Sequence, residues 1–306
     1  MLLFYRKTSK RTSFVCTDDP EPGCWIHAEG ASHEDLQQIS ALTGLDTSLL
    51  NDSLDRYELP RIEQVANNLI FFTRHPLDQE RFLYTTTLTM ILTPVYFVTI
   101  SAVKNSFIES LLIKKHIISS SNCSDWMHQV LLRITQEFNV FIRKTRHSLI
   151  SQEKEMSAVT SEDIYALTKY EEFLNQYLSS LDALRLAVEK LYKIEIIGIY
   201  LQDKALVEGI LNDLKQSEAL SEIIIKNIRS LRDSYQIVFA NNLTKTIKLL
   251  TALTIIFTVP NIVAGIYGMN IHLPFSGSEH AFSILIFSMF ILSGLCGYWF
   301  YRKNWM

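Results

Sequence analysis

The sequence predicts an α+β cytoplasmic domain, a very long stalk helix that continues into a membrane, and two transmembrane helices per chain. Three observations support this fold class. β-branched and aromatic runs alternate with turn-rich segments through residues 1–115. No proline occurs between Asp125 and Pro260, which is typical of long helices. Two uncharged stretches, Leu249–Met269 and Ala281–Tyr301, are each long enough at ~1.5 Å per residue to cross a ~30 Å hydrocarbon layer.

Composition narrows the class of protein. The 306 residues, 48% hydrophobic and 20% charged, suffice for one soluble domain plus membrane segments, and the net charge of −3 argues against a nucleic-acid partner. The N-terminal apolar run is too short for a signal peptide, so the bulk of the chain is expected in the cytoplasm. No P-loop, GxSxG or HExxH occurs, so we expect neither an enzyme nor ATP-driven transport. The scattered cysteines form no CxxC pair and fit a reducing compartment: Cys16, Cys24, Cys123 and Cys296.

Residues 1–115 are expected to form the mixed α/β part of the cytoplasmic domain. One helix begins after Ser32, whose side chain can cap it together with Asp35, and a second covers Asp46–Leu54 before a sharp stop at Glu58–Glu63. Thr93-Pro94 supplies the turn between the last two strands. The expected strands are Phe14–Cys16, Gly23–Ala28, Asn68–Thr73, Tyr84–Leu92 and Tyr96–Ile100.

Residues 116–216 are expected to be a helical region, with helices near 126–150, 162–202 and 204–214. The stalk helix then runs over residues 217–270, roughly 80 Å at ~1.5 Å per residue. Such a helix needs partners along its soluble half. Self-association would supply them; the alternative is a bundle helix that packs only within its own chain. The apolar seam has the spacing of a coiled coil and comprises Leu220, Ile224, Ile228, Leu231, Tyr235, Val238 and Asn242.

The first span carries a stripe of small and polar residues at steps of three, four or seven, which places them on one face of a helix. This stripe comprises Thr244, Thr251, Thr254, Thr258, Asn261 and Gly265. A helix that lines water, or that packs against copies of itself, gains from such a face, whereas a lone helix in lipid does not. The plainer alternative is that the threonine hydroxyls bond back to their own helix.

Basic residues set the expected topology. Lys245 and Lys248 precede the first span, and Arg302 and Lys303 begin the basic tail of residues 302–306. The connector, residues 271–280, holds no Lys or Arg. The positive-inside rule therefore puts both termini in the cytoplasm and the connector outside, for a multi-pass protein of the cell membrane. These four cations could also form a basic belt around the inner end of a pore.

The segment AGIYGMN, residues 264–270, lies at the end of the penultimate span with a second span and a basic C-terminus behind it. It resembles the CorA family of divalent-cation channels, whose signature is the Gly-Met-Asn triplet, here Gly268, Met269 and Asn270. The resemblance extends upstream through residues 231–235 and 247–251. It implies a funnel-shaped homopentamer in membrane lipid. The implied function is Mg²⁺ influx down the gradient and membrane potential, with Co²⁺ also accepted, under the control of cytoplasmic Mg²⁺ and with no organic cofactor.

Five first spans would then enclose the pore. Hydroxyl, amide and backbone oxygens can hydrogen-bond the water shell that Mg²⁺ holds tightly, and no carboxylate is present to slow its release. Ile247 and Leu250 could form an apolar constriction near the cytoplasmic end. At the outer mouth, Asn270 would meet the metal through its hydration water. The pore-lining set is Thr244, Ile247, Leu250, Thr251, Thr254, Thr258, Asn261 and Gly265, with the triplet as the selectivity site.

Two alternatives remain open at this point. The connector contains His272 and His280, and Glu279 is its one acid, whereas the family often has an acid just after the triplet. Imidazole suits Zn²⁺, Ni²⁺ or Co²⁺, so a zinc or other transition-metal transporter is one alternative, although Met269 favours Mg²⁺ within the family. The other alternative is a membrane-anchored coiled-coil sensor or scaffold without transport. Regulatory carboxylates stay unassigned; the candidates are Asp203, Asp213, Glu218 and Glu222.

Overall fold

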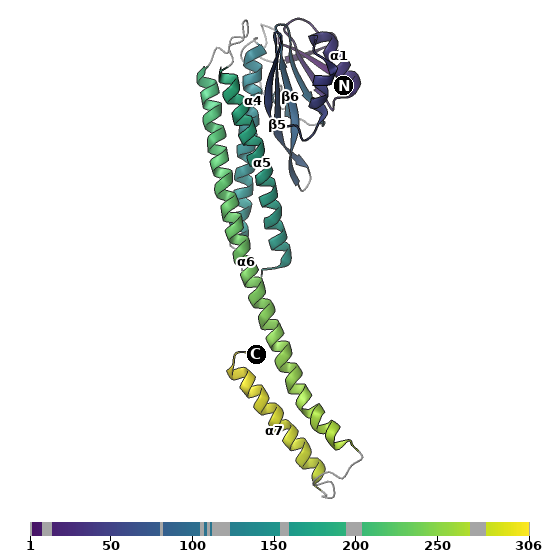
Figure 1. Ribbon diagram of the computed structural model, residues 1–306, viewed down its shortest axis with the longest axis vertical. Helices are drawn as coiled ribbons and strands as arrows, with labels where there is room; N and C mark the ends of the chain where they lie inside the picture. Colours follow the sequence, from purple (N-terminus) through teal and green to yellow (C-terminus); the bar gives the residue numbers. More distant parts are fainter. Residues whose placement is uncertain are drawn as a thin grey trace. The chain divides into compact units, whose positions relative to one another are not determined.

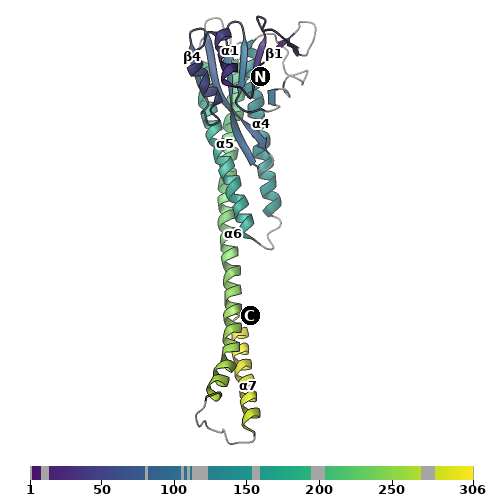
Figure 2. The same cartoon turned by 90° about the vertical axis from the view of Figure 1, so that its right-hand side faces the viewer.

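The structure is a computed structural model that describes residues 2–7, 14–79, 82–104, 107–108, 111, 123–153, 159–193, 204–269 and 280–305. By its internal contacts the chain divides into two compact units, Met1–Ser157 with Tyr165–Ser230, and Ala158–Ile164 with Leu231–Met306. The first unit holds the sheet, the helices that pack on it and the first part of the longest helix, and the second holds the rest of that helix and the last helix of the chain. Figure 1 and Figure 2 show the elements of each unit from two sides.

The first unit is built on a seven-stranded sheet with the order β2-β1-β3-β7-β6-β5-β4. All neighbouring strands are antiparallel except β3 and β7 at the centre, which are parallel. The strands are β1 (Leu2–Lys7), β2 (Phe14–Thr17), β3 (Trp25–Glu29), β4 (Arg61–Val65), β5 (Asn68–Gln79), β6 (Phe82–Leu92) and β7 (Phe97–Ser101). The β5–β6 hairpin is the longest pair, and in both views it runs beside helix α5 (Ser161–Lys193).

One face of the sheet is covered by α1 (His33–Thr43), α2 (Thr47–Leu50) and the 3₁₀ helix η1 (Asn51–Leu54). Alternate strand residues such as Ile26, Phe72 and Val98 pack there against Leu36 and Ile39 of α1. The expected capping of α1 is confirmed. Ser32 Oγ accepts a hydrogen bond from the Asp35 amide, and the Asp35 carboxylate accepts one from the Ser32 amide.

The opposite face of the sheet packs against α4 (Cys123–Glu153). The indole rings of Trp25 and Trp126 stack there with centroids 5.9 Å apart. Trp25 Nε1 donates to Thr99 Oγ1 at 2.8 Å, and His27 Nδ1 lies 2.9 Å from the same hydroxyl oxygen. These polar groups are buried but hydrogen-bonded, so the face tolerates them.

Three expectations about the first 115 residues need correction. β1 was not expected, because Phe4 and Tyr5 are the only residues among its six with a high strand propensity. In the structure it lies between β2 and β3 and pairs with both. The segment Glu58–Glu63 was read as a stop, but its second half begins β4, which pairs with β5. Residues 46–54 form not one helix but a turn of α-helix followed by a 3₁₀ turn. For β1 and β4 pairing with another strand decides the structure.

Helix α6 (Lys204–Tyr267) is one helix of 64 residues, so the expected break before residue 217 is wrong, and the helix stops three residues before 270. In the first unit this helix packs against α4 and α5 of its own chain. In the first unit Ser217 Oγ donates to Asn139 Oδ1 of α4 at 2.9 Å, and Arg229 pairs with Glu171 of α5. Ile224 and Ile228 of the seam are buried. Leu220, Leu231 and Val238 of the seam are partly buried and Asn242 is exposed, so self-association along this helix stays a prediction.

The second unit contains the rest of α6 and α7 (Ala281–Arg302). In the part of the chain that the structure describes, α6 and α7 are the two helices long and apolar enough to cross a membrane. The two helices run antiparallel (Figure 1). α6 continues as a helix through Pro260. The short connector 271–279 lies outside the described residues, as does Asn270.

Candidate ion pathway

The polar stripe of the first span lies on a face of α6 that its own chain leaves uncovered. The expected pore-lining residues are all exposed in the chain: Thr244, Ile247, Leu250, Thr251, Thr254, Thr258, Asn261 and Gly265. By contrast Ala252 is fully buried, and Ile256, Val259 and Val263 are partly buried. The two sets interleave along the sequence but fall on different sides of the helix.

α7 accounts for the covered side. Ser293 Oγ of α7 donates to the carbonyl oxygen of Ile256 at 3.4 Å, and a Cβ at Gly297 would lie 3.7 Å from Ile256 Cδ1. Thr254 and Thr258 are each two residues from Ile256, or about 200° around a helix with ~100° per residue. They therefore point to the opposite side from α7. Sequence reasoning missed Ser293 and Gly297, although small residues four apart on a membrane helix are the usual sign of close helix packing.

The threonine hydroxyls of the stripe bond to their own helix. Thr251 Oγ1 donates to the carbonyl oxygen of Ile247 at 2.8 Å, Thr254 Oγ1 to that of Leu250 at 2.8 Å, and Thr258 Oγ1 to that of Thr254 at 2.7 Å. Thr244 does the same with Ala240. Each hydroxyl proton is thereby committed to the backbone, and each oxygen keeps its lone pairs free as an acceptor. The threonines of this face thus offer acceptors, while the side-chain amide of Asn261 brings both an acceptor and donors.

A column of threonine acceptor oxygens has a definite chemical preference. Water bound to a cation points its oxygen at the ion and its protons outward, so the outer surface of a hydrated cation is made of donors. Oriented threonine oxygens match these donors, whereas a hydrated anion presents the opposite polarity. The back-bonding that was weighed as the plainer alternative is therefore compatible with cation passage and gives the face its polarity.

Two apolar residues stand at the start of the same face. Ile247 is 54% exposed and Leu250 is 65% exposed, and neither is covered by α7. Exposing apolar side chains of this size to water is unfavourable in free energy. If several copies of the chain faced one another, these side chains would exclude water from the space between them. Their position fits the expected constriction near the N-terminal end of the span.

The expected mouth lies where α6 ends. The Gly268 amide donates to the carbonyl oxygen of Ala264 at 2.9 Å and the Met269 amide to that of Ile266 at 3.3 Å, so the last turn is tightened. A Cβ at Gly268 would lie 3.3 Å from the Ala264 oxygen and 3.7 Å from that of Gly265. Glycine thus keeps a side chain away from these carbonyl oxygens. The carbonyl end of a helix carries about half a negative charge, which attracts cations.

Four cations lie at the opposite end of the second unit. Lys245 and Lys248 on α6, Arg302 at the end of α7 and Lys303 just after it are all exposed. From the Ile256–Gly297 contact, Lys248 is roughly 12 Å back along α6 and Arg302 roughly 8 Å forward along α7, at ~1.5 Å per residue. Since the helices are antiparallel, these groups reach similar levels. This placement accords with the basic belt, and also with simple topology anchors.

The groups weighed for other metals do not come together among the described residues. No cluster of three or more His, Cys, Asp or Glu able to hold a metal is found there. His280 precedes α7 and its carbonyl oxygen accepts from the Ile284 amide, while His272, Glu279 and Asp203 lie outside the described residues.

Of the candidate regulatory carboxylates, Glu218 is already engaged. Arg185 Nε donates to both of its oxygens at 2.9 and 3.1 Å, and the same guanidinium bonds Asp182 and Glu189. Burial raises the pKa of Glu218, and the bonds from Arg185 oppose that rise. For Arg185 burial lowers the pKa, but its three carboxylate partners raise it by more. Asp213 and Glu222 lie on other turns of α6.

Comparisons with known proteins show which family this chain is similar to. The family described as CorA-like Mg²⁺ transporter protein matches residues 21–302. A protein of Methanocaldococcus jannaschii named cobalt/magnesium transport protein CorA is 25% identical over 293 residues, covering 92% of this chain and 91% of that protein. A Thermotoga maritima protein of the same name is 19% identical, covering 98% and 88%. The solved M. jannaschii CorA magnesium transporter has a TM-score of 0.78 at 22% identity and covers 100% of this chain and 99% of that one.

Proposed function

Because this chain belongs to the family of CorA-like Mg²⁺ transporter proteins, we propose that it conducts Mg²⁺, with Co²⁺ also accepted, through a channel that identical copies enclose. The observation that carries the proposal is the exposed face of α6 whose threonine oxygens are held as acceptors. That face matches the outer surface of a hydrated cation, and it carries no carboxylate that would hold the ion too long.

A single chain cannot enclose a pore with this face, since α7 covers only the opposite side. Identical subunits arranged in a ring by rotational symmetry could enclose a pore with this face, and the family resemblance implies a ring of five subunits. Each copy would then contribute its stripe to the wall, its Ile247 and Leu250 to an apolar gate, and its Asn270 to the outer mouth. The selectivity site would be the triplet, with Asn270 contacting the ion through hydration water.

The proposed orientation places the N-terminal soluble unit and the basic residues 302–303 in the cytoplasm of a cell whose membrane the two helices span. A membrane potential then draws the ion inward, at about 2.3 kcal/mol per charge per 100 mV, so twice that for a divalent cation. The carbonyl ends of the α6 helices would face the arriving ion. Lys245 and Lys248 would surround the exit.

We include inhibition by cytoplasmic Mg²⁺ in the proposal. With Glu218 held by Arg185 inside one chain, regulatory ligands would come from exposed carboxylates that meet a neighbouring copy, such as Glu222. A carboxylate shared between copies would bind Mg²⁺ only in the closed arrangement, so a rising ion concentration would favour that arrangement.

Ion flux in reconstituted vesicles tests the proposal. The full chain is placed in liposomes that contain a Mg²⁺-sensitive dye, and an inside-negative potential is imposed. We expect dye response to external Mg²⁺ that empty liposomes lack, and competition by Co²⁺ stronger than by Zn²⁺. Dominant Zn²⁺ flux would instead support the transition-metal transporter with His272 and His280 as ligands. If correctly inserted protein gave no flux of any divalent cation, the result would support the membrane-anchored sensor or scaffold without transport.

A further inference from the structure

A second polar feature lies far along the chain from the ion pathway, in the first unit. A cavity of about 810 Å³ opens between the loop after η1, the β5–β6 hairpin and helix α5. This volume is in the range of small-molecule sites. Its lining is Arg56, Tyr57, Leu59, Arg74, Thr85, Glu172, Asn175, Gln176, Ser179 and Ser180.

Arg74 is the central group of this cavity and is only 8% exposed. Its Nε donates to Thr85 Oγ1 at 2.9 Å, its Nη2 to the Thr85 carbonyl oxygen at 2.9 Å, and its Nη1 to the Glu58 carbonyl oxygen at 3.1 Å. These bonds use three of the five guanidinium N–H groups. Among the residues that the structure describes, no carboxylate forms an ion pair with Arg74; the charge of Asp55 acts on it only from a distance.

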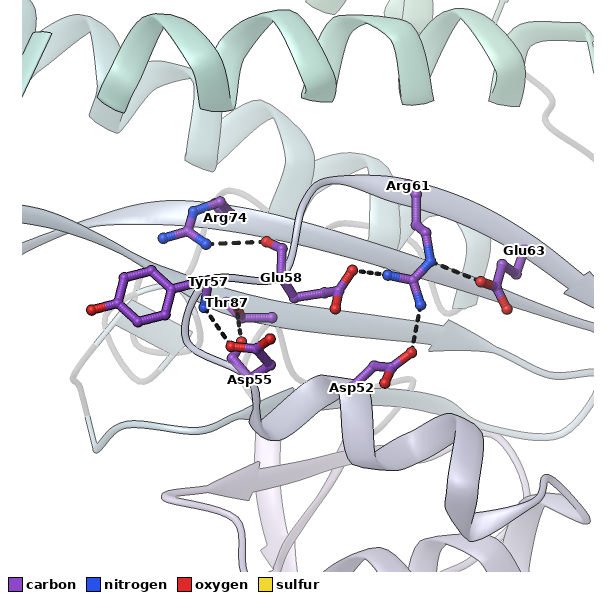
Figure 3. Close-up of polar contacts among 8 residues, drawn as sticks. All are labelled: Asp52, Asp55, Tyr57, Glu58, Arg61, Glu63, Arg74 and Thr87. Atoms are coloured by element: carbon purple, nitrogen blue, oxygen red, sulfur yellow. Dashed lines mark hydrogen bonds and ion pairs between the residues drawn. The ribbon is translucent and has the colours of Figure 1, made fainter. Parts of the chain in front are cut away.

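A neighbouring arginine shows how this fold neutralises a structural guanidinium. Arg61 pairs with Asp52, Glu58 and Glu63, and its guanidinium carbon lies 4.0 Å from the Phe72 ring centroid. Figure 3 shows Arg61 with its carboxylates at one end of the loop, and Arg74 beside Tyr57 at the other end. Burying a charge without a counter-ion is unfavourable in free energy. An anion bound next to Arg74 would remove this penalty, whereas Arg61 already has its carboxylates.

The rest of the lining also suits an anion. Arg56 adds a second, exposed guanidinium, and Asn175 and Gln176 add amide N–H groups from α5. The one carboxylate on the wall, Glu172, accepts from Lys169 Nζ at 2.9 Å and so has its own cation. Two guanidinium groups with amide donors around them are the usual partners of a phosphate group.

Tyr57 indicates what the phosphate is attached to. Its ring is 83% exposed at the edge of the cavity and lies next to the guanidinium of Arg74 (Figure 3). The Tyr57 amide donates to Asp55 Oδ1 at 2.9 Å, and Thr87 Oγ1 donates to the Asp55 carbonyl oxygen, so the loop that carries the ring is anchored. A held, exposed aromatic ring is a stacking surface for a planar group.

We propose that this cavity binds a small organic phosphate of the nucleoside monophosphate type, with its phosphate at Arg74 and Arg56 and its planar ring on Tyr57. The site is separate from the ion pathway and independent of the transport proposal. It would let the soluble domain respond to a metabolite as well as to a metal ion.

Calorimetric titration of the purified full chain in detergent tests this site, with EDTA present so that divalent cations play no part. The probes are AMP, inorganic phosphate and adenosine, at low ionic strength. We expect AMP to bind more tightly than phosphate, and adenosine not to bind. Arg56→Gln should weaken AMP at least tenfold, and Tyr57→Ala should reduce AMP to the affinity of phosphate. Arg146→Gln, an exposed arginine on α4, is the matched control and should bind like the wild type.

Both lining substitutions are at exposed positions, and unchanged melting temperatures would show that the variants are folded. AMP binding that is unaltered by Arg56→Gln would place the ligand elsewhere and overturn the proposal. So would the absence of AMP binding to the wild type, as expected if a carboxylate of a neighbouring copy occupies the cavity. Equal binding of adenosine and AMP would remove the role of the phosphate.

Discussion

Thr258 donates its hydroxyl proton to the backbone carbonyl oxygen of Thr254 at 2.7 Å, one turn earlier on the same exposed face of α6. Thr254 in turn donates to Leu250. The repeated bond removes the proton that would otherwise rotate freely and leaves a column of acceptor oxygens. The proposed selectivity for hydrated cations over anions follows from this orientation together with the absence of charge on the face.

Removing an acceptor oxygen while keeping the side-chain shape should therefore slow the ion. We expect Thr258→Val to lower Mg²⁺ flux about fivefold or more, since every copy in a ring loses one hydrogen bond of ~0.5–1.5 kcal/mol to the water shell. Thr246→Val is the matched control, because Thr246 bonds back to Asn242 in the same way but lies off the stripe. Equal loss of flux in both variants would mean that the lost hydrogen bond to the helix backbone, and not a contact with the ion's water shell, lowers the flux.

The outer mouth depends on Asn270 in our proposal. Asn270→Ala removes a ring of amide carbonyls and should abolish Mg²⁺ uptake in vesicles, while the oligomer measured by native mass spectrometry stays intact. The exposed Asn241 of α6 provides a control through Asn241→Ala, with flux unchanged. Uptake at the wild-type rate in the Asn270 variant would defeat the assignment of this residue.

Gly268 is predicted to be needed for its lack of a side chain. In Gly268→Ala the new Cβ would lie 3.3 Å from the Ala264 oxygen, so the last turn of α6 must shift and its carbonyl oxygens become crowded. We expect flux to fall roughly tenfold with little change in melting temperature. Gly294→Ala on α7 is the control, since a Cβ there meets no atom within 4 Å. A fully active Gly268 variant would show that the mouth is formed differently.

Two buried histidines should make the soluble unit sensitive to acid. Burial lowers the pKa of His27 to about 4, against an opposing bond to Thr99, and lowers that of His75 to about 4 as well. Both are neutral in the folded chain, whereas the unfolded chain takes up their protons below pH ~6.5. Stability is therefore complete above pH ~6.5 and falls toward pH 4, by up to about 1.4 kcal/mol per pH unit for each histidine.

Melting temperatures recorded between pH 7.5 and 5 measure this effect. His27→Gln should have a shallower pH dependence than the wild type, even though its stability at pH 7.5 is lower. His33→Gln, at an exposed position on α1, should keep the full slope. Identical slopes for all three proteins would mean that His27 is not the titrating group.

The ion network between α5 and α6 should matter more for stability than surface pairs do. The Arg185 side chain is 20% exposed and that of Glu218 17%. Arg185→Met leaves three carboxylates without their shared cation, and we expect a loss on the order of 1–3 kcal/mol. Lys169→Gln removes an ordinary surface pair with Glu172 and should cost less than ~1 kcal/mol. Denaturant or thermal unfolding of both variants gives the comparison, and equal effects would contradict the network's role.

The predictable part of this protein lies in features set by neighbouring residues. The two spans, the polar stripe and the capping of α1 were expected from hydrophobic length, helical period and the Ser32–Asp35 pair. β1 and β4 were not expected, because they are strands through pairing with β3 and β5 rather than through their own composition. The break expected before Ser217 was wrong, because α6 is continuous there and Ser217 bonds Asn139 of α4.

By itself the sequence determined that two apolar helices exist, that one of them has a face of hydroxyl and amide groups, and that a Gly-Met-Asn triplet follows it. Tertiary structure decided which side of that helix stays open, because Ser293 and Gly297 bring α7 against Ile256 on the other side. It also decided that Glu218 is held by Arg185, while Arg74, within the described part of the chain, donates to the neutral oxygens of Thr85 and Glu58. Hydrophobic periodicity and composition are properties of neighbouring residues in the sequence. The residues that pair with a charged group, or that cover one face of a helix, come from segments distant in the chain.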